Sequence, residues 1–193
     1  MRRTFVLCLT ILMLITFSIG CGVSRESDPN QFSRVPPAPK ILGGVPASVP
    51  TLDVIYTSDN APQQRVQTAK LTSSWFVDYE DGTGLYSHAD AFHPLSLDTD
   101  SYAEITIQVG GGSGVIELQF SDDYQPSSVS VQHWRAEHAT GRRDITELLD
   151  KGELVEISNG SIHVTADGQD YIYEVYAQWP NGSSFYAFRT EGQ

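Results

Sequence analysis

The stretch Tyr171-Ile-Tyr-Glu-Val-Tyr-Ala-Gln-Trp179 decides the fold of this chain of 193 residues. Apolar or aromatic side chains stand at every second position of the stretch, and Glu174 and Gln178 stand between them. Alternation with a period of two is typical of a β-strand that has one face on a core and the other face in water. The stretch therefore predicts a strand at the border between a core and solvent.

The same alternation recurs through most of the chain between Thr51 and this stretch. Six further segments show it: Leu52–Tyr56, Ser73–Tyr79, Ile105–Val109, Ile116–Phe120, Val129–Val131 and Ile162–Val164. Turns rich in glycine and asparagine, which tolerate the positive φ of tight hairpins, separate the segments. These turns contain Asp81-Gly82, Gly110–Gly114, Asn159-Gly160, Asp167-Gly168 and Asn181-Gly182. About seven to nine short strands of this kind predict an all-β fold, an antiparallel β-sandwich, with a small barrel as the alternative.

One segment has the composition of a helix. Asp144–Asp150 combines an aspartate that suits the N-cap position with a short run of helix-forming residues. We expect a helix of about two turns there, and this segment is the only helix candidate in the domain.

The N-terminal residues predict a lipoprotein signal peptide over residues 1–20. Two arginines precede an apolar run over residues 5–19, and a glycine stands immediately before Cys21. This order is typical of a secretion signal that is cleaved before Cys21, whose thiol then carries a lipid such as palmitate. Ser18 stands where such signals usually have leucine. An uncleaved signal-anchor helix, or secretion without lipidation, therefore remains an alternative to a lipid anchor on the extracytoplasmic face of the cell membrane.

The residues after the signal divide into a tether and a domain. Cys8 would be lost with the signal, so the mature chain would keep only Cys21 and could form no internal disulfide. Residues 21–50 contain six prolines and little periodicity, which predicts a semi-stiff tether with one edge strand over Lys40–Gly44. Residues 51–193 are enough for one sandwich domain.

The charge of the chain excludes some classes of partner. Its 24 acidic residues outnumber 12 basic ones, and the formal net charge is −12. An acidic surface repels nucleic acid and anionic lipid headgroups, because binding them requires Lys and Arg. We therefore expect contact with the membrane through the lipid, and an envelope protein or a glycan as the partner.

Three stretches resemble small lipoproteins of Gram-positive bacteria. The longest is Asp170–Phe188, in which a Tyr-x-x-x-Ala-x-Trp strand turns over a glycine and returns as Tyr-x-Phe. The others are Trp75 with Asp81-Gly-Thr-Gly84 and His93-Pro-Leu95, and Pro126–Trp134. The resemblance covers most of residues 51–190. It implies an Ig-like β-sandwich of unknown function on a lipid anchor, and it implies no catalytic residues.

An acidic turn is the candidate for a metal site. Asp78, Glu80 and Asp81 cluster before Gly82, but their spacing is one residue out of register with an EF-hand loop. A strand that ends in an Asp-Gly turn explains the run without a cation. We therefore predict no metal and no cofactor, with these three acids as the candidate ligands if calcium binds.

The histidines are spaced unfavourably for a shared zinc ion. His88 and His93 lie five residues apart, as do His133 and His138. Residues five apart on a strand point to opposite faces of the sheet. We expect these histidines to be separate packing or surface residues.

The sequence contains no recognised catalytic motif. No serine lies in a Gly-x-Ser-x-Gly motif. Glu104, Glu117 and Glu174 stand at polar strand positions and should face solvent, which does not suit a glycosidase pair. We therefore predict a non-catalytic protein. An envelope hydrolase with a site assembled from loops, or a structural partner of another envelope protein, is the alternative.

The aromatic residues divide into two groups. Trp75, Tyr171, Tyr173 and Trp179 have the phase of the predicted core. A second group has the opposite phase or lies in loops, and consists of Tyr124, Trp134, Tyr176 and Tyr186. Aromatic rings on an open sheet face can stack against sugar rings or a protein partner. We predict that this second group forms the binding surface of an envelope-interaction module.

Overall fold

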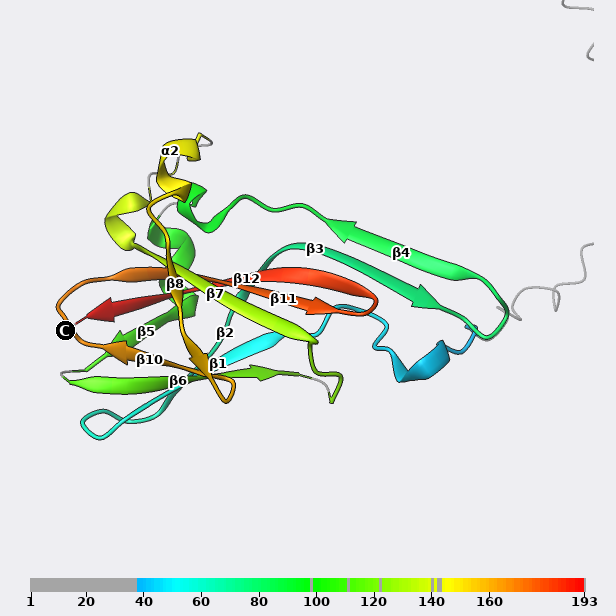
Figure 1. Ribbon diagram of the computed structural model, residues 1–193, viewed down its shortest axis with the longest axis horizontal. Coiled ribbons are helices and arrows are strands. Elements are labelled where there is room, and N and C mark those ends of the chain that lie inside the picture. The colour runs from blue at the N-terminus through cyan, green and yellow to red at the C-terminus, as the bar shows by residue number, and fades with distance from the viewer. Residues whose placement is uncertain are drawn as a thin grey trace, which may run out of the picture. The chain divides into compact units, whose positions relative to one another are not determined.

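A computed structural model describes residues 38–97, 99–110, 112–121, 123–139, 141 and 144–192. The predicted signal peptide, Cys21 and the tether up to residue 37 lie outside these residues. The described part is an all-β sandwich of two sheets with twelve strands (Figure 1). The predicted sandwich is confirmed, and its two separate sheets differ from the alternative of one closed barrel. The strands outnumber the prediction because short edge strands show little alternation.

The smaller sheet has five antiparallel strands in the order β2-β1-β6-β10-β9. These strands are β1 (Leu52–Ser58), β2 (Gln64–Gln67), β6 (Ser113–Phe120), β9 (Ile157–Ser158) and β10 (Ser161–Thr165). Strands β9 and β10 are joined through Asn159 and Gly160, which both have positive φ, as the sequence predicts for a tight hairpin.

The larger sheet has seven strands, six of which follow the order β4-β3-β12-β11-β7-β8. These six are β3 (Ala69–Asp78), β4 (Gly84–Ala89), β7 (Ser128–Arg135), β8 (Glu153–Val155), β11 (Tyr171–Trp179) and β12 (Gly182–Gly192). The seventh, β5 (Thr106–Val109), pairs in parallel with the end of β12. Strand β11 is the stretch with the strongest alternation, and it has a paired strand on each side.

The helical segments are short. They are η1 (Leu42–Gly44), η2 (Pro94–Ser96), η3 (Thr99–Ile105), η4 (Ala136–His138) and α2 (Thr146–Leu149). Helix α2 confirms the predicted helix in shorter form. The Asp144 carboxylate accepts hydrogen bonds from the amide and the hydroxyl of Thr146. Asp144 therefore stabilises the start of the helix from the position before the N-cap residue, which is Ile145.

The main core lies between the two sheets and is built around aromatic rings. The Trp179 ring lies edge-on to Trp75 at 5.4 Å and to Phe120 at 5.5 Å between centroids. The Tyr173 ring is stacked on Phe188 at 4.7 Å. These contacts confirm the predicted core positions of Trp75, Tyr173 and Trp179, each of which is buried.

A second, smaller core covers one end of the outer face of the larger sheet. Its buried members come from η2, η3 and the ends of two strands, and are Leu95, Tyr102, Ile105, Trp134 and Ile172. The Trp134 indole donates a hydrogen bond to the carbonyl of Leu148 at 3.1 Å, which ties α2 to this core. This end of the sheet is therefore packed on both faces, unlike the rest of its outer face.

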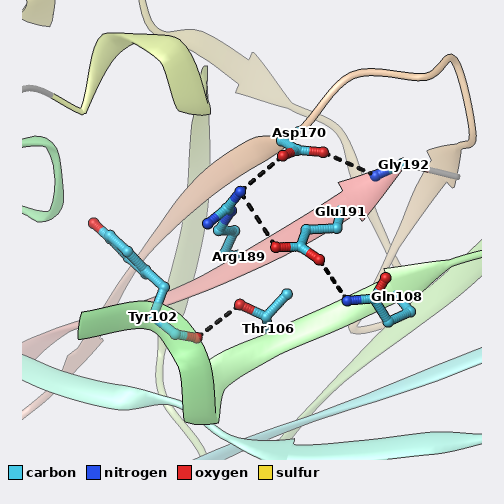
Figure 2. A network of polar contacts seen from close by, with 7 residues as sticks. All are labelled: Tyr102, Thr106, Gln108, Asp170, Arg189, Glu191 and Gly192. Carbon is cyan, nitrogen blue, oxygen red and sulfur yellow. Dashed lines mark hydrogen bonds and ion pairs between the residues drawn. The ribbon is translucent and has the colours of Figure 1, made fainter. Parts of the chain in front are cut away.

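A polar network fixes the end of the chain. The Arg189 guanidinium lies between the carboxylates of Asp170 at 2.7 Å and Glu191 at 3.3 Å (Figure 2). The Gln108 side-chain amide donates to Glu191 at 2.6 Å, and the Gly192 amide donates to Asp170 at 3.2 Å. The network joins β5, β12 and the start of β11, and so holds the parallel pair of the larger sheet.

The residues before Thr51 belong to the sandwich, which corrects the predicted boundary. The compact unit spans Pro39–Gln193. The Trp75 indole donates to the Pro46 carbonyl at 2.9 Å, and the Tyr186 hydroxyl donates to the Pro50 carbonyl at 2.6 Å. Residues 39–50 are therefore part of the compact unit and not of the predicted tether.

The predicted edge strand over Lys40–Gly44 is wrong. Ile41 forms a single bridge with Tyr79, and η1 begins at the next residue. Gly43 and Gly44 both have positive φ, which ends extended structure here.

The contact between Tyr186 and Pro50 generates a stability prediction. Tyr186→Phe removes a buried donor and leaves the Pro50 carbonyl without it, so unfolding should become easier by about 1–3 kcal/mol. Denaturant unfolding measures this loss. The matched control is Tyr171→Phe, whose hydroxyl donates to Asp167 in an exposed position and should cost less. Equal losses in the two variants would mean that residues 46–50 are not anchored to the core.

Candidate functional site

The candidate site lies on the outer face of the larger sheet, beside the second core. A cavity of about 240 Å³ opens there, and it is lined by Leu71, Thr72, Ala91, Phe92, His93, Glu174 and Phe185. Most of these side chains are apolar, whereas His93 and Glu174 can titrate. The cavity is smaller than a typical drug-sized pocket of roughly 300–1,000 Å³, so it suits one group of a larger ligand.

A β-bulge shapes the floor of the cavity. The ladder between β12 and β3 passes from Ser184↔Ser73 to Tyr186↔Lys70, so two residues of β3 oppose the single residue Phe185. Those two residues are Leu71 and Thr72, and both line the cavity with Phe185. A bulge re-aims side chains in this way because it interrupts the alternation of the strand.

Glu174 differs from the sequence prediction that it faces solvent. It lies on β11 opposite Ala187 on one side and Gln132 on the other, and 14% of its side chain is exposed. Burial raises the pKa of the Glu174 carboxyl to about 7. The alternation correctly assigns Glu174 to the outer face, but the segment around His93, distant in sequence, covers that position. Glu104 and Glu117 are exposed, as predicted.

His93 provides the second titratable group. Its Nδ1 accepts a hydrogen bond from the Leu95 amide at 3.2 Å, so Nε2 carries the hydrogen in the neutral ring. This Nε2 lies 3.5 Å from a carboxylate oxygen of Glu174. The imidazole ring is edge-on to Trp134 at 5.0 Å, and burial lowers the pKa of His93 to about 4. Between about pH 4 and 7, the pair therefore holds a protonated carboxyl and a neutral imidazole.

Two aromatic rings, those of Phe92 and Phe185, line this cavity, and other aromatic residues lie further along the outer face. Three of them are strongly exposed: Phe76 at 42%, Tyr86 at 62% and Phe92 at 56%. Phe76 and Tyr86 are direct partners in the ladder between β3 and β4. Tyr176 and Phe185 are partners between β11 and β12, with ring centroids 4.7 Å apart. We call these five residues the outer aromatic face.

Of the four aromatic residues predicted to form a binding surface, only Tyr176 lies on the outer aromatic face. Trp134 and Tyr186 are buried at 2% and 0% exposure, so the prediction is wrong for both. Trp134 does lie on the outer side of the sheet, but the second core covers it. Tyr186 points inward because the turn after Trp179 places it opposite Val175.

Tyr124 also lies away from the outer aromatic face. It is partly buried against the main core, where its ring is edge-on to Trp75 at 6.2 Å. Its carbonyl accepts a hydrogen bond from the Trp179 indole. An exposed aromatic face is present on the larger sheet, but most of its residues differ from those that the sequence predicted.

The sequence prediction missed four members of the outer aromatic face: Phe76, Tyr86, Phe92 and Phe185. Phe76 shares its phase with Thr72 and Ser74, so the alternation of β3 contains the signal for it. Tyr86 lies on β4, where all six residues are exposed and no alternation exists. Phe92 follows that strand in a loop, for which periodicity gives no information.

The acidic turn has a structural role in the hairpin. The Asp81 carboxylate accepts hydrogen bonds from the amide and the hydroxyl of Thr83, at 2.9 and 2.6 Å, and these bonds lower the pKa of Asp81. Asp78, Glu80 and Asp81 are all exposed. Within the described part of the chain, no three His, Cys, Asp or Glu side chains gather as metal ligands.

His133 and His138 do not follow the expected geometry. They line the same cavity of about 280 Å³ together with Glu153, because the chain leaves β7 after Arg135 and turns through η4. The His133 ring is stacked on Tyr171 at 4.8 Å, and its Nε2 lies 3.5 Å from Glu153. The spacing rule for strands failed here because the second histidine lies beyond the end of the strand.

A larger cavity, of about 740 Å³, lies on the smaller sheet and is a polar groove. It is lined by Asp53, Arg65, Glu117, Leu118, Gln119, Phe120, Ser121, Asp123 and Gln125. Its main charged contact is the ion pair between Arg65 and Asp53 at 2.6 Å, and the Arg65 side chain is 59% exposed. We rank the smaller cavity above it because buried groups with shifted pKa values are typical of functional sites.

Comparison of the chain with known protein families, with curated proteins and with solved structures gives no match. Among the described residues, no helix has the length and apolar character that crossing a membrane requires. The functional assignment therefore depends on the geometry of the outer face.

The pair His93–Glu174 generates a prediction about pH. The Glu174 carboxyl has a raised pKa, so the stability it confers is present below pH 4.5 and is lost as the pH rises through 7. His93 has a lowered pKa, so its contribution is present above pH 6.5 and is lost as the pH falls through 4. Between about pH 4 and 7, the contributions of Glu174 and His93 to the stability of the wild type therefore change in opposite directions.

Two variants separate these trends. In Glu174→Gln, the free energy of unfolding should rise by roughly 2–3 kcal/mol from pH 4 to 6.5, at about 1.4 kcal/mol per pKa unit. In His93→Asn it should fall by a similar amount from pH 4.5 to 7. Denaturant unfolding at several pH values measures both. Variant profiles parallel to that of the wild type would contradict the buried pair.

Proposed function

We propose that this protein is a lipid-anchored, extracytoplasmic lipoprotein that acts as a non-catalytic binding module of the cell envelope. Its ligand is an uncharged glycan, which lies on the outer aromatic face. One group of that ligand enters the cavity beside Glu174. The lipid on Cys21 holds the module at the membrane.

The observation that carries this proposal is the set of exposed rings on one sheet face. Phe76, Tyr86 and Phe92 are each more than 40% exposed, and they lie outside both cores. Exposed rings offer flat apolar surfaces on which sugar rings can stack, while hydroxyl groups need polar partners. Glu174 and His93 supply such partners at the wall of the cavity.

The net charge of −12 supports an uncharged ligand rather than an anionic one. An acidic protein repels phosphate-rich or carboxylate-rich polymers over roughly 10–30 Å, depending on the ionic strength. A neutral sugar chain meets no such barrier.

A hydrolase is the second candidate, favoured by the raised pKa of Glu174. A carboxyl that stays protonated near pH 7 can act as a general acid. Glycoside hydrolysis commonly needs a second carboxyl roughly 5–10 Å away, however. Glu174 is the sole carboxyl among the residues that line the cavity, which favours binding.

The glycan proposal predicts the effect of removing exposed rings. Phe92→Ala and Tyr86→Ala should each weaken binding of N-acetylglucosamine tetramers by about tenfold, because a stacked ring contributes on the order of 1 kcal/mol. Both side chains are exposed, so stability should change by less than about 0.5 kcal/mol. Calorimetric titration measures the affinity.

Leu42→Ala is the matched control, since Leu42 is 47% exposed but lies on η1, away from the outer aromatic face. This variant should bind like the wild type. Equal losses in all three variants, or wild-type affinity in the ring variants, would contradict the proposed surface.

The anchor generates a separate prediction. Cys21→Ala removes the thiol that would carry the lipid, so the protein should move from the membrane fraction to the soluble fraction and lose labelling by a palmitate analogue. Cys8→Ala, within the predicted signal, should leave both properties unchanged. Membrane association and labelling that persist in Cys21→Ala would contradict lipidation at this residue.

A further inference from the structure

Strand β4 leaves one edge of the larger sheet open. It pairs with β3 from Ser73↔Ala89 to Asp78↔Gly84, and it stands at the end of the strand order. In the described part of the chain, no strand pairs with its other side, as Figure 1 shows. All six residues are exposed, so neither face of the strand is covered either. An edge of this kind presents a row of backbone N–H and C=O groups that can pair with another strand.

The remaining edges of the two sheets are protected. The edge strand β2 has four residues and includes Arg65, β8 has three and begins at Glu153, and β9 has two. The free edge of strand β5 is covered by the side chain of Gln64. Its Nε2 donates a hydrogen bond to the backbone carbonyl of Gln108 at 2.7 Å, and its Oε1 accepts one from the backbone amide of Gln108 at 2.9 Å. Short length, charge and coverage are the usual means by which proteins prevent unwanted pairing.

Strand β4 uses none of these means. The sequence Gly84-Leu-Tyr-Ser-His-Ala89 has no lysine, arginine, acid or proline, and its ladder with β3 runs without a register shift. Leu85 is 50% exposed although it pairs with the buried Val77. A regular edge with no Lys, Arg, acid or proline is costly for solubility, which indicates a use for it.

We infer that β4 binds an extended segment of a partner protein, which adds to the larger sheet as a further strand. Backbone hydrogen bonds along the free edge provide the affinity in this mode of recognition, and alternate side chains provide the specificity. The site is distinct from the outer aromatic face in its ligand class, and it uses the backbone of β4 rather than the aromatic rings.

Charge defines the chemistry of the segment. No Lys or Arg occurs in the sequence between Lys70 and Arg135, whereas acids flank β4 on both sides. Glu80 and Asp81 precede the strand and Asp90 follows it, and all three are exposed. The complementary segment is therefore an uncharged, alternating strand with a basic residue at each end.

A second copy of this chain is a poor occupant of the edge. Antiparallel pairing of two β4 strands would bring Asp90 of one copy beside Glu80 and Asp81 of the other, and parallel pairing would bring like ends together. Either arrangement places carboxylates against carboxylates, and like charges in direct contact weaken association.

The test uses fluorescently labelled peptides and the full chain in detergent solution. One ten-residue peptide has alternating Thr and Val between terminal Lys residues, a second has Glu in place of Lys, and a third has the Lys sequence with N-methylated backbone amides. The Lys peptide should bind saturably by fluorescence anisotropy. The Glu peptide should bind at least tenfold more weakly, and the methylated peptide should not bind.

Two double variants locate the binding. Leu85→Lys with Ala89→Lys places cations on β4 and should weaken binding of the Lys peptide at least tenfold, while glycan binding persists because the aromatic rings are intact. Thr57→Lys with Gln67→Lys makes the same charge change at exposed positions of the smaller sheet, and should retain binding. Melting temperatures confirm that both variants fold.

Three results with the peptides would overturn the inference. They are no binding of the Lys peptide, equal binding of the Glu or methylated peptide, and equal affinities in the two double variants. Self-association that sedimentation detects and that the β4 variant abolishes would assign the edge to a second copy instead. Ring variants that bind glycan like the wild type, while peptide binding is intact, would contradict the proposed function alone.

Discussion

The register between β11 and β12 is the constraint on which the rest of the structure depends. The turn through Pro180 and Asn181 sets Trp179 opposite Gly182, which in turn sets Val175 opposite Tyr186 and Tyr176 opposite Phe185. A slip of one residue would exchange the two faces of the strand. Gly182 helps to fix the position, because a methyl group there would overlap the Ser74 carbonyl and approach the Trp75 ring to 2.8 Å.

This register separates the core from the binding surface. On the inner side, Tyr186 reaches the carbonyl of Pro50 and anchors the segment that precedes β1. On the outer side, Phe185 and Tyr176 form one end of the outer aromatic face, and the bulge opposite Phe185 opens the cavity at Glu174. The larger sheet thus supplies both candidate surfaces, its outer face and the open edge at β4.

The sequence was sufficient for the features that depend on local pattern. Alternation placed Trp75 and Trp179 in the core, and glycine and asparagine marked the hairpins. It was insufficient where distant segments meet: Trp134 and Glu174 have the phase of an outer face, yet η2, η3 and the loop before them bury both. It also gave no signal for β4, since a strand with two exposed faces has no alternation to detect.

Mapping of a bound glycan by NMR tests the central claim most directly. Backbone amide shifts of the labelled protein would be followed during titration with an uncharged N-acetylglucosamine tetramer. The account predicts that the perturbed amides cluster at Thr72, Phe92, Glu174 and Phe185. Perturbations confined to the polar groove of the smaller sheet, around Glu117 and Gln119, or no perturbation with any glycan, would contradict it.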